Sequence, residues 1–467
     1  MRLENLPYRS LLYAALIALV TALFIAIGAL YAIRTPPWQA PDEPAHYNYV
    51  AQVAGQGCCP VIAPGDWDAA ELEALKAAQF PENADLSGIE YEDHQPPLYY
   101  LIASVVFDLT GGDLIALRLL SVTCGAGIVL AAFYTAARLF PRWPTLALAA
   151  AIFAGFVPQH VAILASVNND SLAGLLLGVL TVVAVGYLGN PVTPGYDGKP
   201  QPWDESHRPH AAALGGFLGL IFLTKLTIYL PGVVIALLAV AWRWRLEGRP
   251  ARWLASQLAW IGALALPLGA LWWVRNALVY GFPDLLGQSA HQAVVVGQLH
   301  TGEFIAANGF GEYLRQFARV TYQSFWGQFG WMGVPMPARD YLLLGLFSLW
   351  ALAGAVLLAR GRGVLSMVGQ QRGAVWILAW ASLATLLEYG YYNLTFVQFQ
   401  GRYLFPAMIS IALVVGIGGW GWSATLRRWL GGEVWERRLA WLPVAAVAWM
   451  PPYAVWALLR YVIPNLG

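Results

Sequence analysis

The chain has 467 residues, of which 58% are hydrophobic and only 11% are charged, and its formal net charge is +1 at pH 7. Soluble domains carry roughly 25% charged residues, so the composition excludes a soluble globular protein and indicates an integral membrane protein. We expect no nucleic-acid partner.

The first long apolar segment covers residues 10–33 and follows Arg2 and Arg9. It is longer than a signal peptide core and no small-residue cleavage site follows it, which predicts a retained membrane anchor. Ten further segments are long enough to cross about 30 Å of hydrocarbon as helices. They lie near residues 114–137, 144–165, 170–189, 211–224, 226–242, 253–274, 341–359, 374–394, 403–421 and 439–459. The sequence therefore predicts an all-α polytopic membrane bundle of about eleven transmembrane helices.

Basic residues in the connecting loops predict the orientation of this bundle. With a cytoplasmic N-terminus, most of the 27 Lys and Arg residues fall in inner loops, as the positive-inside rule requires. These are Arg2, Arg9, Arg138, Arg142, Lys199, Arg208, Arg243, Arg245, Arg249, Arg252, Arg360, Arg362, Arg372, Arg427, Arg428, Arg437 and Arg438. The first outer loop is strongly acidic, so we expect a multi-pass cell-membrane protein with this loop outside the cytoplasm.

One further apolar segment, "PPLYYLIASVVFDLTG" at 96–111, is predicted to be an interfacial helix. Counting it as a span would place the arginine clusters outside, against the positive-inside rule. The predicted organisation is thus a single transmembrane domain over 1–467, with two large outer loops. The first, 34–113, is acidic and contains interfacial helices, and the second is 275–340.

Polar residues from distant parts of the sequence are expected on the outer side. Their convergence at the membrane margin is a site hypothesis, because ionisable groups there are costly unless they meet water, a partner or a substrate. The candidates are Asp42, Glu43, His46, His94, Arg118, Asn169, Asp170, Lys225, Arg275, Arg402 and Tyr403.

Several sequence blocks also carry a resemblance to a known family. In order along nearly the whole chain they are "APDEPAHYNYV", "EDHQPPLYYL", "ALRLLSVTCG", "SVNNDSLAG", "FLTKLTIYLPG", "WWVRNALVYGFPD" and "FQGRYLFPAM". The chain resembles the GT-C superfamily of polytopic glycosyltransferases. It is most similar to the protein O-mannosyltransferase and aminoarabinose transferase branch, and to a bacterial group that shares the "PDEPAH" and "QGRY" blocks. The resemblance implies transfer of a sugar from a polyprenyl-phosphate or diphosphate donor to an acceptor on the outer face, with inversion.

Such a transfer needs a base for the proton of the acceptor and positive charge for the departing phosphate. Asp42 suits the first role, since it follows a rigid helix and is flanked by prolines. The resemblance also assigns the acidic pair after the first span to catalysis, with Asp42 as base and Glu43 as its support. The alternative is that the two carboxylates cap a short helix that begins near Pro44.

The other acidic and histidine candidates have weaker patterns. His94 stands where the aminoarabinose branch has Glu, and it could assist a metal ion or the acceptor, as could His46. Asp170, beside Asn169, matches the second acidic position of the family, with helix capping as the alternative. No cofactor is predicted, no metal-ligand set is identified, and a divalent ion remains open.

The cationic candidates suit the phosphate of the donor. Arg402, followed by Tyr403, offers a planar fork for phosphate oxygens, while Lys225 and Arg275 lie at outer helix ends. The alternative for each is an interfacial anchor. Arg118 is expected to pair with the acidic loop.

A rival function of a different class is a polytopic transporter or flippase of a lipid-linked sugar. Transporter sites tend to lie mid-bilayer on broken, repeated helices, whereas the acids here lie in outer loops. The sequence leaves the acceptor open among lipid, glycan and protein, and it names no sugar.

Overall fold

The computed structural model describes residues 7–189, 208–360 and 367–466, and within them the chain is almost entirely helical. The first half contains α1 (Pro7–Arg34), α2 (Glu43–Gln56), α3 (Ala69–Ala77), α4 (Leu98–Thr110), α5 (Leu114–Leu139), α6 (Pro144–Phe156), α7 (Pro158–Leu164), α8 (Asp170–Gly189), α9 (Arg208–Phe222), η2 (Leu226–Ile228) and α10 (Tyr229–Leu246). The second half contains α11 (Ala251–Val279), α12 (Gln288–Val294), α13 (Thr301–Asn308), α14 (Phe310–Trp326), α15 (Ala338–Arg360), α16 (Gly369–Thr395), η3 (Gly401–Ala407), α17 (Met408–Leu430), α18 (Glu433–Leu439), α19 (Leu442–Val447), α20 (Met450–Ala457), η4 (Leu458–Val462) and α21 (Ile463–Leu466). The strands β1 (Gln328–Phe329) and β2 (Val334–Pro335) form a small antiparallel hairpin, in which Gln328 pairs with Pro335 and Phe329 with Val334.

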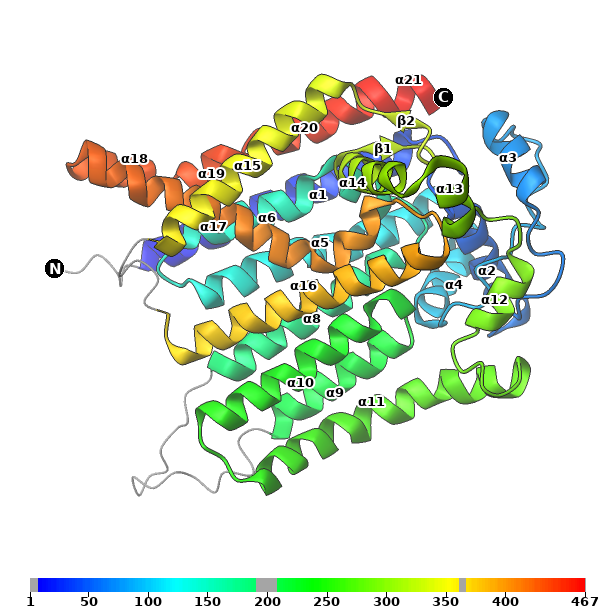
Figure 1. Ribbon diagram of the computed structural model, residues 1–467, viewed down its shortest axis with the longest axis horizontal. Helices are drawn as coiled ribbons and strands as arrows, with labels where there is room; N and C mark the ends of the chain where they lie inside the picture. The colour runs from blue at the N-terminus through cyan, green and yellow to red at the C-terminus, as the bar shows by residue number, and fades with distance from the viewer. Residues whose placement is uncertain (1–6, 190–207, 361–366, 467) are drawn as a thin grey trace.

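Nine helical segments of the described residues are long and apolar enough to cross a membrane. Helices α6 and α7 form a bent tenth, with a 64° break before Pro158, where proline removes a backbone N–H and disfavours helix in the preceding residue. The shorter apolar helix α9 packs along α11 and beside α10 (Figure 1). The nine segments, the bent pair and α9 together match the eleven predicted segments, so the predicted all-α polytopic bundle is confirmed.

Small residues allow close helix packing inside the bundle. At the crossing of α15 and α17, a methyl group on Gly354 would overlap the backbone carbonyl of Gly418, and one on Gly421 would overlap that of Gly354. Such contacts are typical of membrane helices, which associate through packing because the lipid around them is equally apolar. Large apolar side chains such as Leu349 and Leu352 remain exposed on the outer surface of α15, as a lipid-facing helix requires.

The two ends of the bundle differ in character. At the right-hand end in Figure 1, the short helices α2, α3, α4, α12 and α13 gather beyond the ends of the long helices. Helix α4 has 13 residues and extends about 20 Å, which is less than the thickness of the hydrocarbon.

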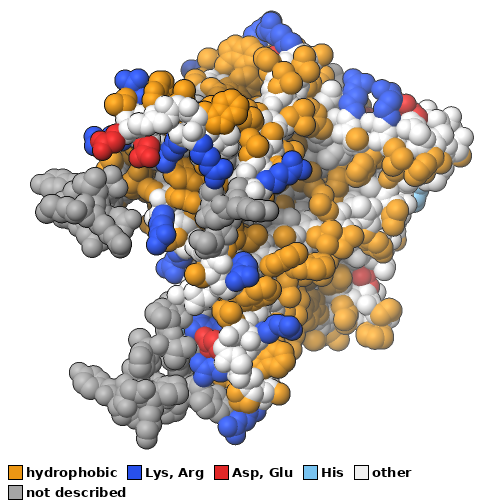
Figure 2. All heavy atoms as spheres, turned by 60° about the vertical axis from the view of Figure 1, so that its left-hand side comes forward, with side chains coloured by type: hydrophobic (Ala, Val, Ile, Leu, Met, Phe, Trp, Pro, Cys, Tyr) orange, Lys and Arg blue, Asp and Glu red, His pale blue; other side chains and the backbone are white. Residues whose placement is uncertain are grey.

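The opposite end carries most of the basic residues. Arg138, Arg243, Arg360 and Arg427 stand in the last turns of α5, α10, α15 and α17. Figure 2, which brings this end forward, shows many more Lys and Arg than Asp and Glu side chains. Of the inner-loop residues used to predict the orientation, Arg2, Lys199 and Arg362 lie outside the described residues, as do the side chains of Arg9 and Arg208.

Candidate functional site

Asp42 ends the turn that follows α1 and immediately precedes α2. Its backbone is left-handed, with φ 66°, a conformation that Asp tolerates better than most residues. The helix does begin where the capping alternative expects it, with Pro44 in the first turn, but the Asp42 side chain makes no capping hydrogen bond. The carboxylate is therefore available to other partners.

Both oxygens of the Asp42 carboxylate have partners. Tyr91 donates its hydroxyl to Oδ1 at 2.8 Å, and Arg402 Nη2 donates to Oδ2 at 2.6 Å. Burial opposes ionisation of Asp42, but the charge and hydrogen bond of Arg402 outweigh it and hold the pKa of Asp42 at about 2. Asp42 is thus a carboxylate at neutral pH, and its basicity is suppressed while it is paired with Arg402.

A glycine fixes the position of Arg402 at the start of η3. A methyl group on Gly401 would overlap the backbone of Thr321 and Phe325 in α14, so only glycine allows this approach. The Gly401 N–H donates to Ser324 Oγ at 2.7 Å. Arg402 is therefore held by packing between two helices, and its guanidinium lies 5.5 Å from the centroid of the Tyr403 ring.

Glu43 is fully buried and pairs with Arg118. Arg118 Nε and Nη2 donate to the two Glu43 oxygens at 2.7 and 2.5 Å, a bidentate arrangement. The same guanidinium also donates to the backbone carbonyls of Ala32 and Thr35 at the end of α1. The expected pairing of Arg118 with the acidic loop is confirmed, and it ties α1, α5 and the start of α2 together behind Asp42.

A second ion pair joins the start of α8 to the turn before α10. Lys225 Nζ lies 2.7 Å from Asp170 Oδ1 and donates to Asn169 Oδ1 at 2.7 Å. The backbone N–H of Asp170 donates to Asn168 Oδ1, so Asn168 serves the helix start and the Asp170 carboxylate faces Lys225.

Of the two predicted histidines, His46 is buried and His94 is partly buried, and both are neutral. His46 Nδ1 and the Tyr100 hydroxyl share a hydrogen bond of 2.8 Å, and burial lowers the pKa of His46 to about 3. His94 Nδ1 donates to the Tyr91 carbonyl, and its ring lies 4.1 Å from that of His291, centroid to centroid. Burial and His291 hold the pKa of His94 well below its usual range.

A cavity of about 410 Å³ brings most of these groups together. Of the predicted residues it is lined by Asp42, His46, His94, Asp170, Lys225, Arg402 and Tyr403. Glu43, Arg118, Asn169 and Arg275 do not line it. Glu43 and Arg118 pair with each other behind Asp42, whereas Asn169 accepts a hydrogen bond from the lining residue Lys225. Arg275 is directed elsewhere, because its guanidinium donates to the backbone carbonyls of Cys59 and Pro60 and anchors that loop on α11.

Sequence reasoning missed several residues of this cavity. Glu92 lines it, and its buried Oε2 has no hydrogen-bond partner. Burial, followed by the charge of Asp42, raises the pKa of Glu92 to about 8. Tyr91 holds Asp42 from the same turn, and Tyr392 and His291 come from α16 and α12. The one available signal was the position of Glu92 at the start of the block "EDHQPPLYYL", two residues before His94, and Tyr91 lies just before that block.

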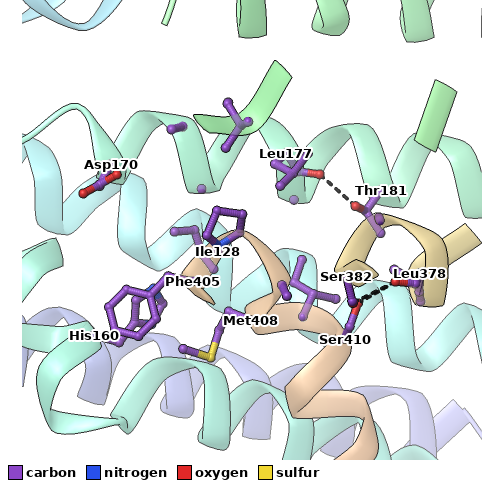
Figure 3. Close-up of a pocket in the computed structure, with 18 of the residues that line it drawn as sticks. Ile128, His160, Asp170, Leu177, Thr181, Leu378, Ser382, Phe405, Met408 and Ser410 are labelled. Atoms are coloured by element: carbon purple, nitrogen blue, oxygen red, sulfur yellow. Dashed lines mark hydrogen bonds between the residues drawn. The ribbon is translucent and has the colours of Figure 1, made fainter. Parts of the chain in front are cut away.

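A second, much smaller cavity lies deeper between α8, α16 and α17, as Figure 3 shows. Its volume of about 40 Å³ has room for a few water molecules but not for a sugar. Asp170 lines both cavities. The hydroxyls of Thr181 and Ser382 donate to carbonyls of their own helices, so they offer little to a ligand.

Comparisons with known proteins give fold-level similarity only. No family model and no curated protein matches the chain. Among solved structures, ArnT from Cupriavidus metallidurans bound to undecaprenyl phosphate is 16% identical, with 96% of this chain and 73% of that chain covered and a TM-score of 0.47. The apo state of the same protein is also 16% identical, with 97% of this chain and 74% of that chain covered and a TM-score of 0.47. The Archaeoglobus fulgidus oligosaccharyltransferase in complex with Zn and sulfate is 14% identical, with 95% of this chain and 52% of that chain covered and a TM-score of 0.35. At these values the structural similarity assigns no family, and the resemblance to the GT-C superfamily rests on the sequence blocks from "APDEPAHYNYV" to "FQGRYLFPAM".

Proposed function

We propose that the protein is a membrane glycosyltransferase that moves a hexosyl or pentosyl group from a polyprenyl-phosphate or diphosphate donor to an acceptor, with inversion. One observation carries this proposal: Asp42, Asp170, Lys225 and Arg402 come from four distant parts of the chain and line one cavity. Two cations paired with two carboxylates at the ends of apolar helices suit a ligand with an anionic head and a lipid tail, and Glu92 and Glu388 also line this cavity.

The cavity is proposed to open on the extracytoplasmic side. The basic residues concentrate at the other end of the bundle (Figure 2), and the positive-inside rule assigns that end and the N-terminus to the cytoplasm. The acidic loop between α1 and α5 then lies outside, together with the residues that it contributes to the cavity.

Arg402 and Lys225 are proposed to bind the donor phosphate, with Tyr403 beside them. Arg402 Nε is buried without a hydrogen-bond partner, so the guanidinium has donor capacity left for a phosphate oxygen. A bound phosphate would compete with the Asp42 carboxylate for Arg402. Loss of that pairing would raise the proton affinity of Asp42, so donor binding would make Asp42 a stronger base.

The reaction is a single displacement at the anomeric carbon of the donor sugar. The acceptor oxygen forms the new bond to this carbon as the bond to the phosphate oxygen breaks, and the electron pair leaves with the phosphate. Asp42 takes the proton of the acceptor, and Arg402 and Lys225 stabilise the charge on the departing phosphate. Attack opposite the leaving group inverts the anomeric configuration. Glu43 supports Asp42 through Arg118, which fixes the start of α2.

The test supplies the purified protein with a polyprenyl phosphate that carries a radiolabelled sugar, together with candidate lipid, glycan and peptide acceptors. The expected result is loss of label from the lipid fraction and its appearance in one acceptor class, with the opposite anomeric configuration. In proteoliposomes, movement of the intact donor across the bilayer without loss of sugar would contradict the proposal and favour a flippase.

A further inference from the structure

A cluster of carboxylates lies outside the cavity, in the acidic loop. Asp66, Glu90 and Asp93 each place one carboxylate oxygen so that all three oxygens lie within 4.8 Å of one another. Asp93 is buried, with 1% of its surface exposed, and the other two are partly buried. None of the three forms an ion pair with a described residue, so the cluster gathers three carboxyl groups without a counter-charge from the described part of the protein.

A second observation points to a missing ligand at this cluster. Asp93 Oδ1 is buried and has no hydrogen-bond partner, whereas its other oxygen accepts from Gln52 Nε2 at 2.9 Å. A buried carboxylate oxygen without a partner costs free energy that a cation would recover. Burial raises the pKa of Asp93 to about 8, and the charges of Glu90 and Asp66 act in the same direction.

We propose that Asp66, Glu90 and Asp93 bind a hard divalent cation of the Ca²⁺ type. The donor set consists of oxygen atoms only, which such ions prefer, and it lacks the thiolate or imidazole that would favour a transition metal. Two oxygens at about 2.4 Å on opposite sides of one Ca²⁺ would be about 4.8 Å apart, which the observed spacing allows. Water molecules would complete the coordination.

The cation would act on the position of the cavity wall rather than on the reaction itself. The Glu90 N–H donates to the Asp66 carbonyl at 3.1 Å, and the Trp67 and Tyr91 rings pack edge to face at 5.0 Å. The ion would therefore lock two loop segments together. One of them carries Glu92, which lines the cavity, and Tyr91, which donates its hydroxyl to Asp42. Binding itself does not depend on the proposed transfer reaction.

The test is calorimetric titration of Ca²⁺ into the full-length protein in detergent, after treatment with a chelator. We expect one site with a Kd of about 1 mM or below, typical of extracellular Ca²⁺ modules. The double variant Asp66→Asn, Glu90→Gln should weaken binding at least tenfold. Its matched control is Glu71→Gln, Glu82→Gln, which removes two exposed charges of the same loop and should bind as the wild type does.

A spectroscopic experiment covers the case in which the double variant does not fold. Tb³⁺ bound at the cluster would lie beside Trp67, so excitation of tryptophan should produce Tb³⁺ emission that Ca²⁺ suppresses. Trp67→Phe should remove most of this emission while leaving calorimetric Ca²⁺ binding intact. The proposal is overturned if the wild-type protein binds no Ca²⁺ up to about 10 mM, or if folded Asp93→Asn and Glu90→Gln single variants bind it unchanged.

Discussion

Arg402 and Asp42 are 360 positions apart in the chain, yet Arg402 Nη2 lies 2.6 Å from Asp42 Oδ2 in a shared cavity. The pair joins the turn after the first span to the start of the next-to-last one. The two residues suit different roles in the proposed sugar transfer, since the Asp42 carboxylate can accept a proton and the Arg402 guanidinium can bind a phosphate. The first two predictions separate these roles.

Asp42→Asn should leave the protein folded and bound to donor, and should reduce transfer by at least about 10²-fold, because the amide cannot take a proton from the acceptor. The measurement is turnover of labelled donor, with donor affinity measured in parallel. Asp108→Asn, which alters an exposed aspartate outside the cavity, is the control and should be fully active. Turnover of Asp42→Asn at the wild-type rate would remove Asp42 as the base.

Arg402→Ala should weaken binding of polyprenyl phosphate by about 10- to 100-fold, as expected for loss of hydrogen bonds to a charged group. Quenching of tryptophan fluorescence on titration with the lipid would report the affinity. Arg315→Ala is a suitable control, because Arg315 is exposed and pairs with Glu312 on its own helix. An unchanged affinity would mean that Arg402 serves only to hold Asp42.

Arg118→Ala should destabilise the fold by about 3–5 kcal/mol, because it leaves the buried Glu43 carboxylate without its partner. Thermal unfolding in detergent, followed by tryptophan fluorescence, would show the loss. Arg437→Ala removes an exposed arginine and should change the unfolding temperature little. Replacing both partners, as Glu43→Gln with Arg118→Met, should cost less than the sum of the single changes. Additive effects would show that the two residues do not act as a pair.

The sequence predicted the bundle well because spans in lipid must be long, apolar and helical, and these requirements are local. The break at Pro158 and the hairpin of β1 and β2 were not predicted, since they depend on packing between segments. For the site, the resemblance drew attention to Asp42, Asp170, Lys225 and Arg402, which the structure places around one cavity.

The sequence did not distinguish the residues that line the cavity from the residues that hold those side chains in place. Glu43 is adjacent to Asp42 in the chain, but the helix that begins there turns its side chain toward Arg118 and away from the cavity. Arg275 stands at an expected helix end, yet it binds loop carbonyls. Glu92 was missed because its effect depends on burial near Asp42, which becomes visible only in the folded chain.

Glu92 predicts a pH dependence of stability. Its pKa is raised from 4.5 to about 8 in the folded protein, mainly by burial, so the folded state holds a proton that the unfolded state releases. The stability that this provides is fully present below pH 4.5 and is lost as the pH rises to about 8. As the pH rises from 4.5 to about 8, the unfolding temperature of the wild-type protein should fall relative to that of Glu92→Gln. If the unfolding temperatures of the two proteins changed with pH in parallel, the raised pKa of Glu92 would be contradicted.

Cysteine labelling tests the proposed sidedness, on which the reaction scheme depends. Helices α3 and α18 lie at opposite ends of the molecule (Figure 1), and Glu73 and Arg437 on them have 71% and 81% of their side chains exposed. In a background without Cys58, Cys59 and Cys124, Glu73→Cys should react with an impermeant maleimide in right-side-out vesicles, and Arg437→Cys only in inside-out vesicles. Reaction of both from the same side would contradict the bundle orientation. The reverse pattern would place the cavity on the cytoplasmic face and exclude an extracytoplasmic acceptor.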